Sequence, residues 1–461
     1  MQNLEEQIKD LEIEKEQSEM WDEEDNALNI SDKDLKIHSH PETPNVKSLY
    51  DDFKDGDLIL QPDYQRRFVW DKKKASNLIE SILLDIPIPP IFISEENGKR
   101  EVIDGQQRLA SIFHYMDNTF ISSSGVQTSG FKLSKLKVLE SLSGKKFKEL
   151  NETQQKAIKK RALSVIVIEA NTNKDIKFEM FNRLNSNITK LNNQELRNCL
   201  YRGKYNEFIK RLAQNDTFKK LINRPDYEKR MLTEELVLLY FTFLDKDYHQ
   251  YKGNMKQLLN NNMENNKNIT DKNLKDKEEK FKKSIDIIKM MFKDGEAFRI
   301  FGYDDKNKYY KFEKTKINQG LYLILMYWFS IYEKNQVMPY LDILREELLN
   351  LQTHNEDFVL SLTGSGTNNV SSILKKFDIW GNTVKNILDY PHSEPRIFSY
   401  QLKEQLFNEN NTCSICGNKI HNIDDCEIDH IECFSKGGLT IAENARLTHR
   451  YCNRHRATKG E

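Results

Sequence analysis

Crowding of cysteines near one end is the feature that most constrains how this chain can fold. Five of the six cysteines lie between residues 413 and 452, whereas Cys199 is isolated. Cys413-Ser-Ile-Cys416-Gly has the spacing of a zinc knuckle, in which two thiolates bind one tetrahedral ion. His449-Arg-Tyr-Cys452 supplies a second ligand pair about thirty residues later. The spacing therefore predicts a structural Zn²⁺ bound by Cys413, Cys416, His449 and Cys452.

A rival second pair, Cys452-Asn-Arg-His455, shares Cys452 with the first. We prefer His449, because this choice leaves Asn453 and the basic residues after it for other chemistry. Inert buried thiols would not explain two paired spacings. In a cytosolic chain such crowding indicates metal binding rather than disulfides.

Length and composition indicate a protein of several domains that stays in the cytoplasm. The 461 residues exceed the size at which one hydrophobic core stops growing, and 31% of them are charged. No apolar run reaches the roughly 20 residues that span a bilayer, and the N-terminus lacks the pattern of a signal peptide. We therefore expect no membrane association. The net charge of −1 leaves DNA contacts to local clusters of basic residues.

The pattern along the chain predicts an α+β protein of four segments. Residues 1–38 form an acidic helical segment and linker, 39–205 an α/β domain, 206–395 a helical domain, and 396–461 the zinc-binding domain. In the α/β domain we expect strands at 91–94, 100–103 and 162–170, with a helix from Gln106. In the helical domain we expect amphipathic helices at 233–244 and 318–335. The polar run 260–280 between them predicts a solvated loop that leads into a helix.

Between the zinc-ligand pairs lies a second ordered set of residues. It consists of Asp429-His430, Ser435-Lys436-Gly437-Gly438, Asn444 and Cys452-Asn453. On these residues the C-terminal region resembles the HNH nuclease family, of the zinc-containing McrA-like type. The resemblance implies a ββα-metal fold and a metal-dependent DNA endonuclease. The chain departs from the family where Cys433 replaces a proline and where the late lysine is Lys459, so Arg454 or Arg456 is a candidate for the phosphate contact of that lysine.

Hydrolysis of a phosphodiester needs an activated water and a cation that neutralises the charge on the leaving oxygen. By resemblance, His430 is the general base, and Asp429 and Asn453 are oxygen ligands of a catalytic Mg²⁺ or Mn²⁺. Asn444 has a structural role, in which it fixes the loop and orients the base. The glycine pair makes the turn of the β-hairpin.

Arginines and amides also gather beside strand-to-helix turns in the N-terminal region. They occur in Tyr64-Gln65-Arg66-Arg67-Phe68-Val69-Trp70 and in Ile103-Asp104-Gly105-Gln106-Gln107-Arg108-Leu109. The free N–H groups of a helix N-terminus bind anions, and an arginine in the first turn adds a partner for phosphate. For Arg108 alone, a capped helix with a solvated arginine would be the better explanation.

Two further motifs, Phe181-Asn182-Arg183-Leu184-Asn185 and Leu191-Asn192-Asn193-Gln194-Glu195-Leu196-Arg197, complete the pattern. Residues 40–205 resemble the ParB/sulfiredoxin-like domain of GmrSD-type restriction proteins. The resemblance implies a domain that binds and hydrolyses a nucleoside triphosphate, although the chain has no Walker-A motif. The nucleotide site that it implies comprises Gln65, Arg66, Asp104, Gln106, Gln107 and Arg108, with Asn182 and Asn185 nearby.

The two resemblances together predict a nucleotide-regulated endonuclease that restricts phage or other foreign DNA, in particular modified DNA. One alternative is a nucleotide-gated, ParB-like protein that binds DNA without cutting it. A binder of this kind would need neither Asp429 nor His430. A second alternative is an HNH endonuclease whose N-terminal domain recognises DNA without hydrolysing a nucleotide. The sequence leaves assembly into a homo-oligomer open.

Overall fold

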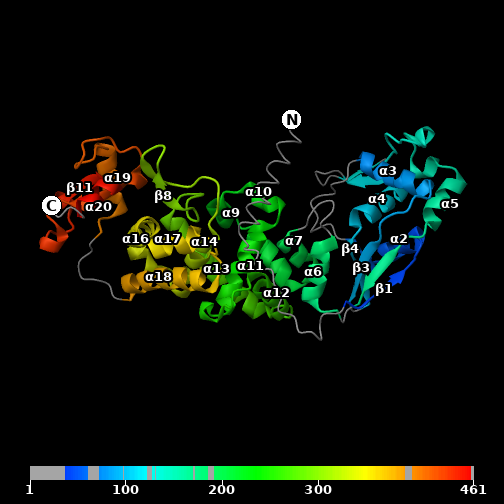
Figure 1. Ribbon diagram of the computed structural model, residues 1–461, viewed down its shortest axis with the longest axis horizontal. Coiled ribbons are helices and arrows are strands. Elements are labelled where there is room, and N and C mark those ends of the chain that lie inside the picture. The colour runs from blue at the N-terminus through cyan, green and yellow to red at the C-terminus, as the bar shows by residue number, and fades with distance from the viewer. Residues whose placement is uncertain are drawn as a thin grey trace.

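The computed structural model describes residues 37–60, 72–96, 98–121, 127–129, 131–169, 172–184, 192–389 and 397–457. An α/β part, a helical part and a small C-terminal part follow one another along the long axis in chain order (Figure 1). The predicted α+β, multidomain fold is therefore confirmed. Nearly all of the predicted acidic segment 1–38 lies outside the described residues. Among the described helices, none has the length and apolar character to cross a lipid bilayer.

A mixed five-stranded sheet organises the N-terminal part, in the order β1-β7-β3-β4-β2. The pairs β3–β7 and β2–β4 are parallel, whereas β1–β7 and β3–β4 are antiparallel. The strands predicted at 91–94, 100–103 and 162–170 correspond to β3, β4 and β7. The bounds are β1 (Ser39–Glu42), β2 (Leu58–Ile59), β3 (Ile91–Glu96), β4 (Lys99–Asp104) and β7 (Val165–Ile168).

Four helices pack with this sheet around one hydrophobic core. Helix α3 shows why: its apolar side chains recur at helical spacing, and Ala75, Ile79 and Ile82 are buried. Asn151 begins α5 with a capping box that includes Gln154. The helices are α2 (Val46–Asp55), α3 (Lys72–Leu83), α4 (Gln106–Met116) and α5 (Glu152–Lys160), and β5 (Thr119–Ile121) pairs with β6 (Gln127–Ser129).

The middle of the chain is helical, with a second and larger core. The predicted helices 233–244 and 318–335 correspond to α11 and α14. The hairpin of β8 (Phe301–Asp304) and β9 (Tyr309–Phe312) was not predicted. The helices are α6 (Lys174–Leu184), α7 (Asn193–Leu200), α8 (Lys204–Ala213), α9 (Asp216–Ile222), α10 (Pro225–Lys229), α11 (Leu232–Asp245), α12 (Met255–Asn265), α13 (Asp271–Met291), α14 (Gln319–Ile331), α15 (Lys334–Val337), α16 (Leu341–His354), α17 (Glu356–Thr363) and α18 (Val370–Leu388).

The prediction of a solvated loop across residues 260–280 was wrong in its first part. Helix α12 continues to Asn265, and α13 begins at Asp271. Asn260 and Asn262 are buried rather than solvated. Their side-chain oxygens accept hydrogen bonds from Arg197 at 3.0 Å and from Tyr205 at 2.7 Å, respectively, which replace hydrogen bonds to water. In the sequence, polar residues that form hydrogen bonds with each other inside a protein cannot be told apart from those of a solvated linker.

A buried ion pair joins α7 to α11. Arg197 is fully buried, and its guanidinium donates to Glu235 at 2.9 Å and to Gln194 at 3.3 Å. Burial raises the pKa of Glu235, and Arg197 partly offsets that rise. Leu196 of the same motif packs with Ile103 of β4 and Ile168 of β7, so α7 contacts both the sheet and the helical part.

Replacing Arg197 by alanine is expected to lower the free energy of unfolding by about 3–5 kcal/mol, because Glu235 would remain buried without its counterion. Thermal or urea denaturation monitored at α7 and α11 would measure this loss. Arg183, which is 79% exposed in its pair with Glu179, is the matched control, and Arg183→Ala should change stability by less than about 1 kcal/mol. Equal losses from the two substitutions would contradict the assignment.

The C-terminal part has the strand–strand–helix order of a ββα unit, confirming the predicted fold. Its elements are α19 (Tyr400–Glu409), β10 (Cys426–His430), β11 (Ala445–His449) and α20 (Arg450–Ala457), and the two strands are antiparallel. This part contacts the helical part through charged groups. Arg450 donates to Glu346 of α16 at 2.5 Å, and the N–H of Tyr310 in β9 donates to Asp425 at 3.0 Å.

Candidate functional site

A Cys3His cluster forms where the knuckle meets β11 and α20. The ligand atoms of Cys413, Cys416, His449 and Cys452 all lie within 4.8 Å of one another. Gly417 adopts φ +72°, and its N–H donates to the Cys413 carbonyl at 2.9 Å, which closes the turn of the knuckle. The structure therefore brings together the four residues that the spacing selected for zinc.

The protonation of these thiols shows why the cluster suits a cation. Burial opposes the thiolate of Cys413, yet N–H groups of Cys416, His449 and Ile415 bring its pKa down to about 7. Burial and the neighbouring sulfurs raise the pKa of Cys452 to about 12. A divalent ion would relieve this repulsion between sulfurs, and three thiolates with one imidazole are typical zinc ligands.

The rival ligand His455 lies elsewhere. Its ring stacks on Tyr451 with centroids 3.8 Å apart, and its Nδ1 lies 2.9 Å from the Tyr451 carbonyl oxygen. Cys426 is also outside the cluster, since its thiol donates to the Ile423 carbonyl at 3.0 Å. Cys433 lines the pocket described next.

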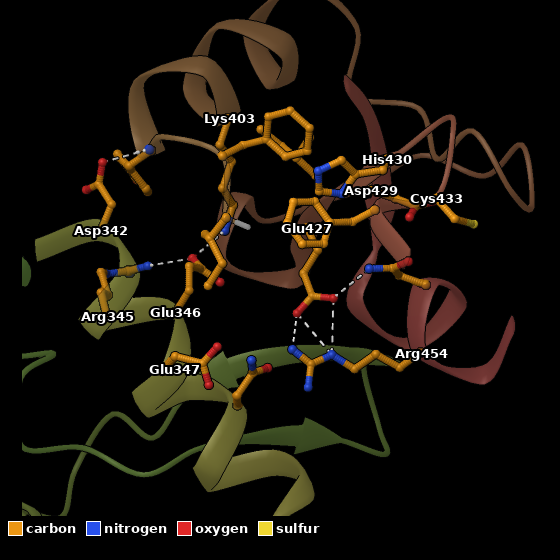
Figure 2. Close-up of a pocket in the computed structure, with 17 residues that line it drawn as sticks. Asp342, Arg345, Glu346, Glu347, Lys403, Glu427, Asp429, His430, Cys433 and Arg454 are labelled. Atoms are coloured by element: carbon orange, nitrogen blue, oxygen red, sulfur yellow. Dashed lines mark hydrogen bonds and ion pairs between the residues drawn. The ribbon is translucent and has the colours of Figure 1, made fainter. Parts of the chain in front are cut away.

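A pocket of about 610 Å³ opens between the ββα unit and α16. Asp429, His430 and Asn453 all line it, together with acidic residues of α16 (Figure 2). Asp429 and His430 end β10, and Asn453 lies in α20. The pairing of β10 with β11, together with the turn into α20, thus brings a carboxylate, an imidazole and a carboxamide to one pocket.

The imidazole of His430 is held on several sides. Its Nε2 lies 2.9 Å from the Thr440 hydroxyl oxygen, and the ring contacts Phe398 and Phe434 with centroids 4.5 and 5.5 Å away. The contact with the Thr440 hydroxyl and the two aromatic rings restrict the orientation of the imidazole. The surroundings therefore suit a base held in one orientation.

Asn444 holds the loop between β10 and β11. Its side chain accepts from the N–H of Glu432 at 2.7 Å and donates to the carbonyls of Glu432 and Leu439 at 3.1 and 2.9 Å. A Cβ at Gly438 would lie 1.9 Å from the Glu432 carbonyl oxygen, so only glycine fits there. Through these contacts Asn444 orders the loop that contains Thr440.

The two candidate ligands of the catalytic ion each have a protein partner. Arg446 donates to one oxygen of Asp429, with its Nε at 2.8 Å. The Nδ2 of Asn453 donates to Glu427 at 3.0 Å. Glu427 lies outside the motif residues read from the sequence. The sequence did contain a signal for Glu427: it lies two residues from Asp429 on a strand, so the two side chains project from the same face. One carboxylate and one amide oxygen on a pocket open to water are chemically suited to Mg²⁺, which keeps several of its waters.

Three of the N-terminal motif residues, Asp104, Gln106 and Arg108, make hydrogen bonds within the protein. Asp104 ends β4, and Arg108 in the first turn of α4 donates to it at 2.5 Å and to the carbonyls of Pro89 and Pro90. The Gln106 amide donates to the Val102 carbonyl at 2.7 Å. Arg108 is therefore a paired arginine rather than a solvated one.

The other predicted nucleotide-site residues are placed only in part. Gln107 lies beside Gln106 in α4, and Asn182 lies in α6. Gln65, Arg66 and Asn185 lie outside the described residues. Of the two arginines considered for phosphate contact, Arg454 donates to Glu427 at 3.0 Å.

Fold and site define a protein in which a sheet-based N-terminal domain is joined through helices to a metal-binding ββα domain with nuclease-like residues. Comparison with known families agrees at both ends. Residues 46–202 match the family described as GmrSD restriction endonuclease, N-terminal domain, and residues 413–459 match HNH endonuclease. The chain therefore joins a GmrSD-type N-terminal domain to an HNH endonuclease domain. This confirms the two family resemblances predicted from the motifs. No significant match was found among curated proteins or solved structures.

Proposed function

We propose that this protein is a nucleotide-regulated, metal-dependent DNA endonuclease that restricts phage or other foreign DNA, in particular modified DNA, in the cytoplasm. In this proposal the segments 1–38, 39–205, 206–395 and 396–461 act as linker, nucleotide-binding domain, helical connection and nuclease. The observation that carries the proposal is the shared pocket of Asp429, His430 and Asn453 within the HNH-matched region. Zn²⁺ has a structural role in the Cys3His cluster.

The chemistry follows from the positions of the side chains. His430 takes a proton from a water as the water oxygen forms a bond to phosphorus, and the bond from phosphorus to the leaving oxygen breaks. Thr440 and the rings of Phe398 and Phe434 hold the imidazole in place for this transfer. Asp429 and Asn453 would hold Mg²⁺ or Mn²⁺, which when bound supplies charge neutralisation at the phosphate oxygens.

Regulation by a nucleoside triphosphate rests on the GmrSD-type match and on the turn between β4 and α4. Arg108 lies at the N-terminus of α4 with Gln106 and Gln107, where a phosphate would find N–H groups and a guanidinium. Binding there would require Arg108 to exchange its carbonyl partners at Pro89 and Pro90 for phosphate oxygens.

Arg108→Ala is expected to weaken nucleotide binding roughly ten- to hundredfold, because a charged hydrogen bond contributes about 1.5–3 kcal/mol. Equilibrium binding of a fluorescent triphosphate would measure the change. The control is Lys156→Ala, since Lys156 is an exposed residue of α5. This variant should bind the triphosphate as the wild type does. Retention of full affinity by Arg108→Ala would remove this residue from the nucleotide site.

The proposal as a whole is tested by incubating unmodified and modified phage DNA with the protein and Mg²⁺, each with and without a nucleoside triphosphate. We expect cleavage that changes with nucleotide and is strongest on modified DNA. Binding without cleavage under all four conditions, by protein that retains its zinc, would favour a DNA-binding function instead. Cleavage unaffected by nucleotide, with no phosphate released, would indicate an HNH endonuclease without NTPase activity.

A further inference from the structure

Glu427 lines the nuclease pocket, and several charged groups donate hydrogen bonds to its side chain. Its side chain is 12% exposed and accepts from Arg450 at 2.8 Å and from the Nδ2 of Asn453 at 3.0 Å. It also accepts from the Nε of Arg454 at 3.0 Å (Figure 2). Two charged guanidinium groups and one carboxamide donate to this carboxylate, and so many donors hold it in one orientation.

The donors are divided unequally between the two oxygens of Glu427. Oε1 receives both arginines, whereas Oε2 receives Asn453 and a longer contact of 3.1 Å from the Nε of Arg454. Oε2 can only accept from Asn453, so this contact requires the NH₂ end of the Asn453 carboxamide to face Glu427. The Oδ1 end of Asn453 is then turned away from Glu427, and only this oxygen end can ligate a cation.

We propose that Glu427 is a positioning residue for the nuclease site, which fixes the Asn453 carboxamide with its oxygen presented to the catalytic ion. This inference rests on the proposed function, because it takes Asn453 as a ligand of that ion. Glu427 itself touches neither water nor phosphate in this role. It acts as partners of metal ligands commonly do, by orienting the ligand.

Two contacts to α16 keep Glu427 and its arginines in place. Arg450 is fully buried and donates to Glu346 at 2.5 Å, while Arg454 lies 2.6 Å from the His354 Nδ1 through its Nη1. The arginines that hold Oε1 are thus anchored in the helical domain. The orientation of Asn453 therefore depends on the contact between the HNH domain and α16.

Glu427→Gln is the sharpest test, because it preserves volume and changes only one hydrogen-bonding group. The arginines at Oε1 would retain the carbonyl oxygen of the new amide, so its NH₂ group would face Asn453. Two NH₂ groups cannot hydrogen-bond to each other, and Asn453 would turn its oxygen towards residue 427. We expect Mn²⁺ affinity of the full-length, zinc-loaded protein, measured by calorimetric titration with Mn²⁺ alone, to fall about ten- to hundredfold.

A second substitution separates orientation from general damage. In Glu427→Gln combined with Asn453→Asp, the aspartate can accept from the new amide with one oxygen and present the other to Mn²⁺, so affinity should recover. In the Asn453→Asp single variant the carboxylates of residues 427 and 453 face each other without a donor between them. Its affinity for Mn²⁺ should therefore not rise as it does in the double variant. Glu443→Gln, an exposed residue of the same domain, should bind Mn²⁺ as the wild type does.

The inference fails if Glu427→Gln keeps the wild-type affinity for Mn²⁺, or if the double variant binds no better than Glu427→Gln. Zinc content and the midpoint of thermal unfolding, measured on each variant, identify any loss of folding. Wild-type Mn²⁺ binding and DNA cleavage are measured first. Their absence would overturn the proposed function, whereas a negative result with Glu427→Gln in a protein that binds Mn²⁺ and cuts DNA would overturn only the role of Glu427.

Discussion

His430→Ala is expected to reduce DNA cleavage in Mg²⁺ by about 10²- to 10⁴-fold, the usual contribution of a positioned general base. The physical reason is that no other imidazole lines the described pocket, so the attacking water would lose its proton acceptor. Single-turnover cleavage of plasmid DNA measures the effect on the chemical step. DNA binding and zinc content should stay close to those of the wild type, because His430 is not a zinc ligand.

His421 provides the matched control, since it is an exposed histidine in the same domain and does not line the pocket. His421→Ala should cleave at the wild-type rate. If His430→Ala also cleaved at that rate, the assignment of His430 as the base would be wrong. The proposed catalytic use of Asp429 and Asn453 would then need a different proton acceptor.

Cys416→Ala is expected to remove the zinc and unfold the HNH domain, while the two larger domains remain folded. Among the described residues of this domain, the largest buried apolar cluster has four members, Cys413, Ile420, Cys426 and Leu447, which is too small to stabilise the domain. Structural zinc contributes about 10–16 kcal/mol in peptides of comparable size. Zinc analysis and hydrogen exchange over residues 397–457 would show the loss of metal and of protection.

Cys433→Ser is the control for this experiment, because Cys433 lies outside the Cys3His cluster. It should retain one zinc per chain and normal protection from exchange. Retained protection in zinc-free Cys416→Ala protein would show that contacts with α16, including the pair of Arg450 and Glu346, are sufficient to hold the domain. The proposed structural role of zinc would then be wrong.

The ligand spacing and the order of the HNH motif were readable from the sequence because both depend on residues close along the chain. A knuckle places Cys413 and Cys416 on one turn whatever surrounds it, and β10 and β11 are neighbours in sequence. Strands β3 and β4 were predictable for the same reason. Local geometry set by short spacings determines these features.

Only the tertiary structure decided which polar residues are partners. Arg197 belongs to a motif that was read only as part of the GmrSD-type resemblance, and its partner Glu235 is 38 positions away in another helix. Arg108 was predicted to contact a phosphate, and in the folded chain the carbonyls of Pro89 and Pro90 and the carboxylate of Asp104 accept hydrogen bonds from it.

The two predicted metal sites also depend partly on the sequence and partly on the tertiary structure. The sequence by itself predicted the four zinc ligands from their spacing, and it predicted Asp429, His430 and Asn453 from the order of the motif that resembles the HNH family. The role inferred for Glu427, and its connection to Glu346 of α16 through Arg450, required the folded chain. Burial gives such long-range ion pairs and hydrogen bonds their strength, and burial depends on the packing of elements that are distant in sequence.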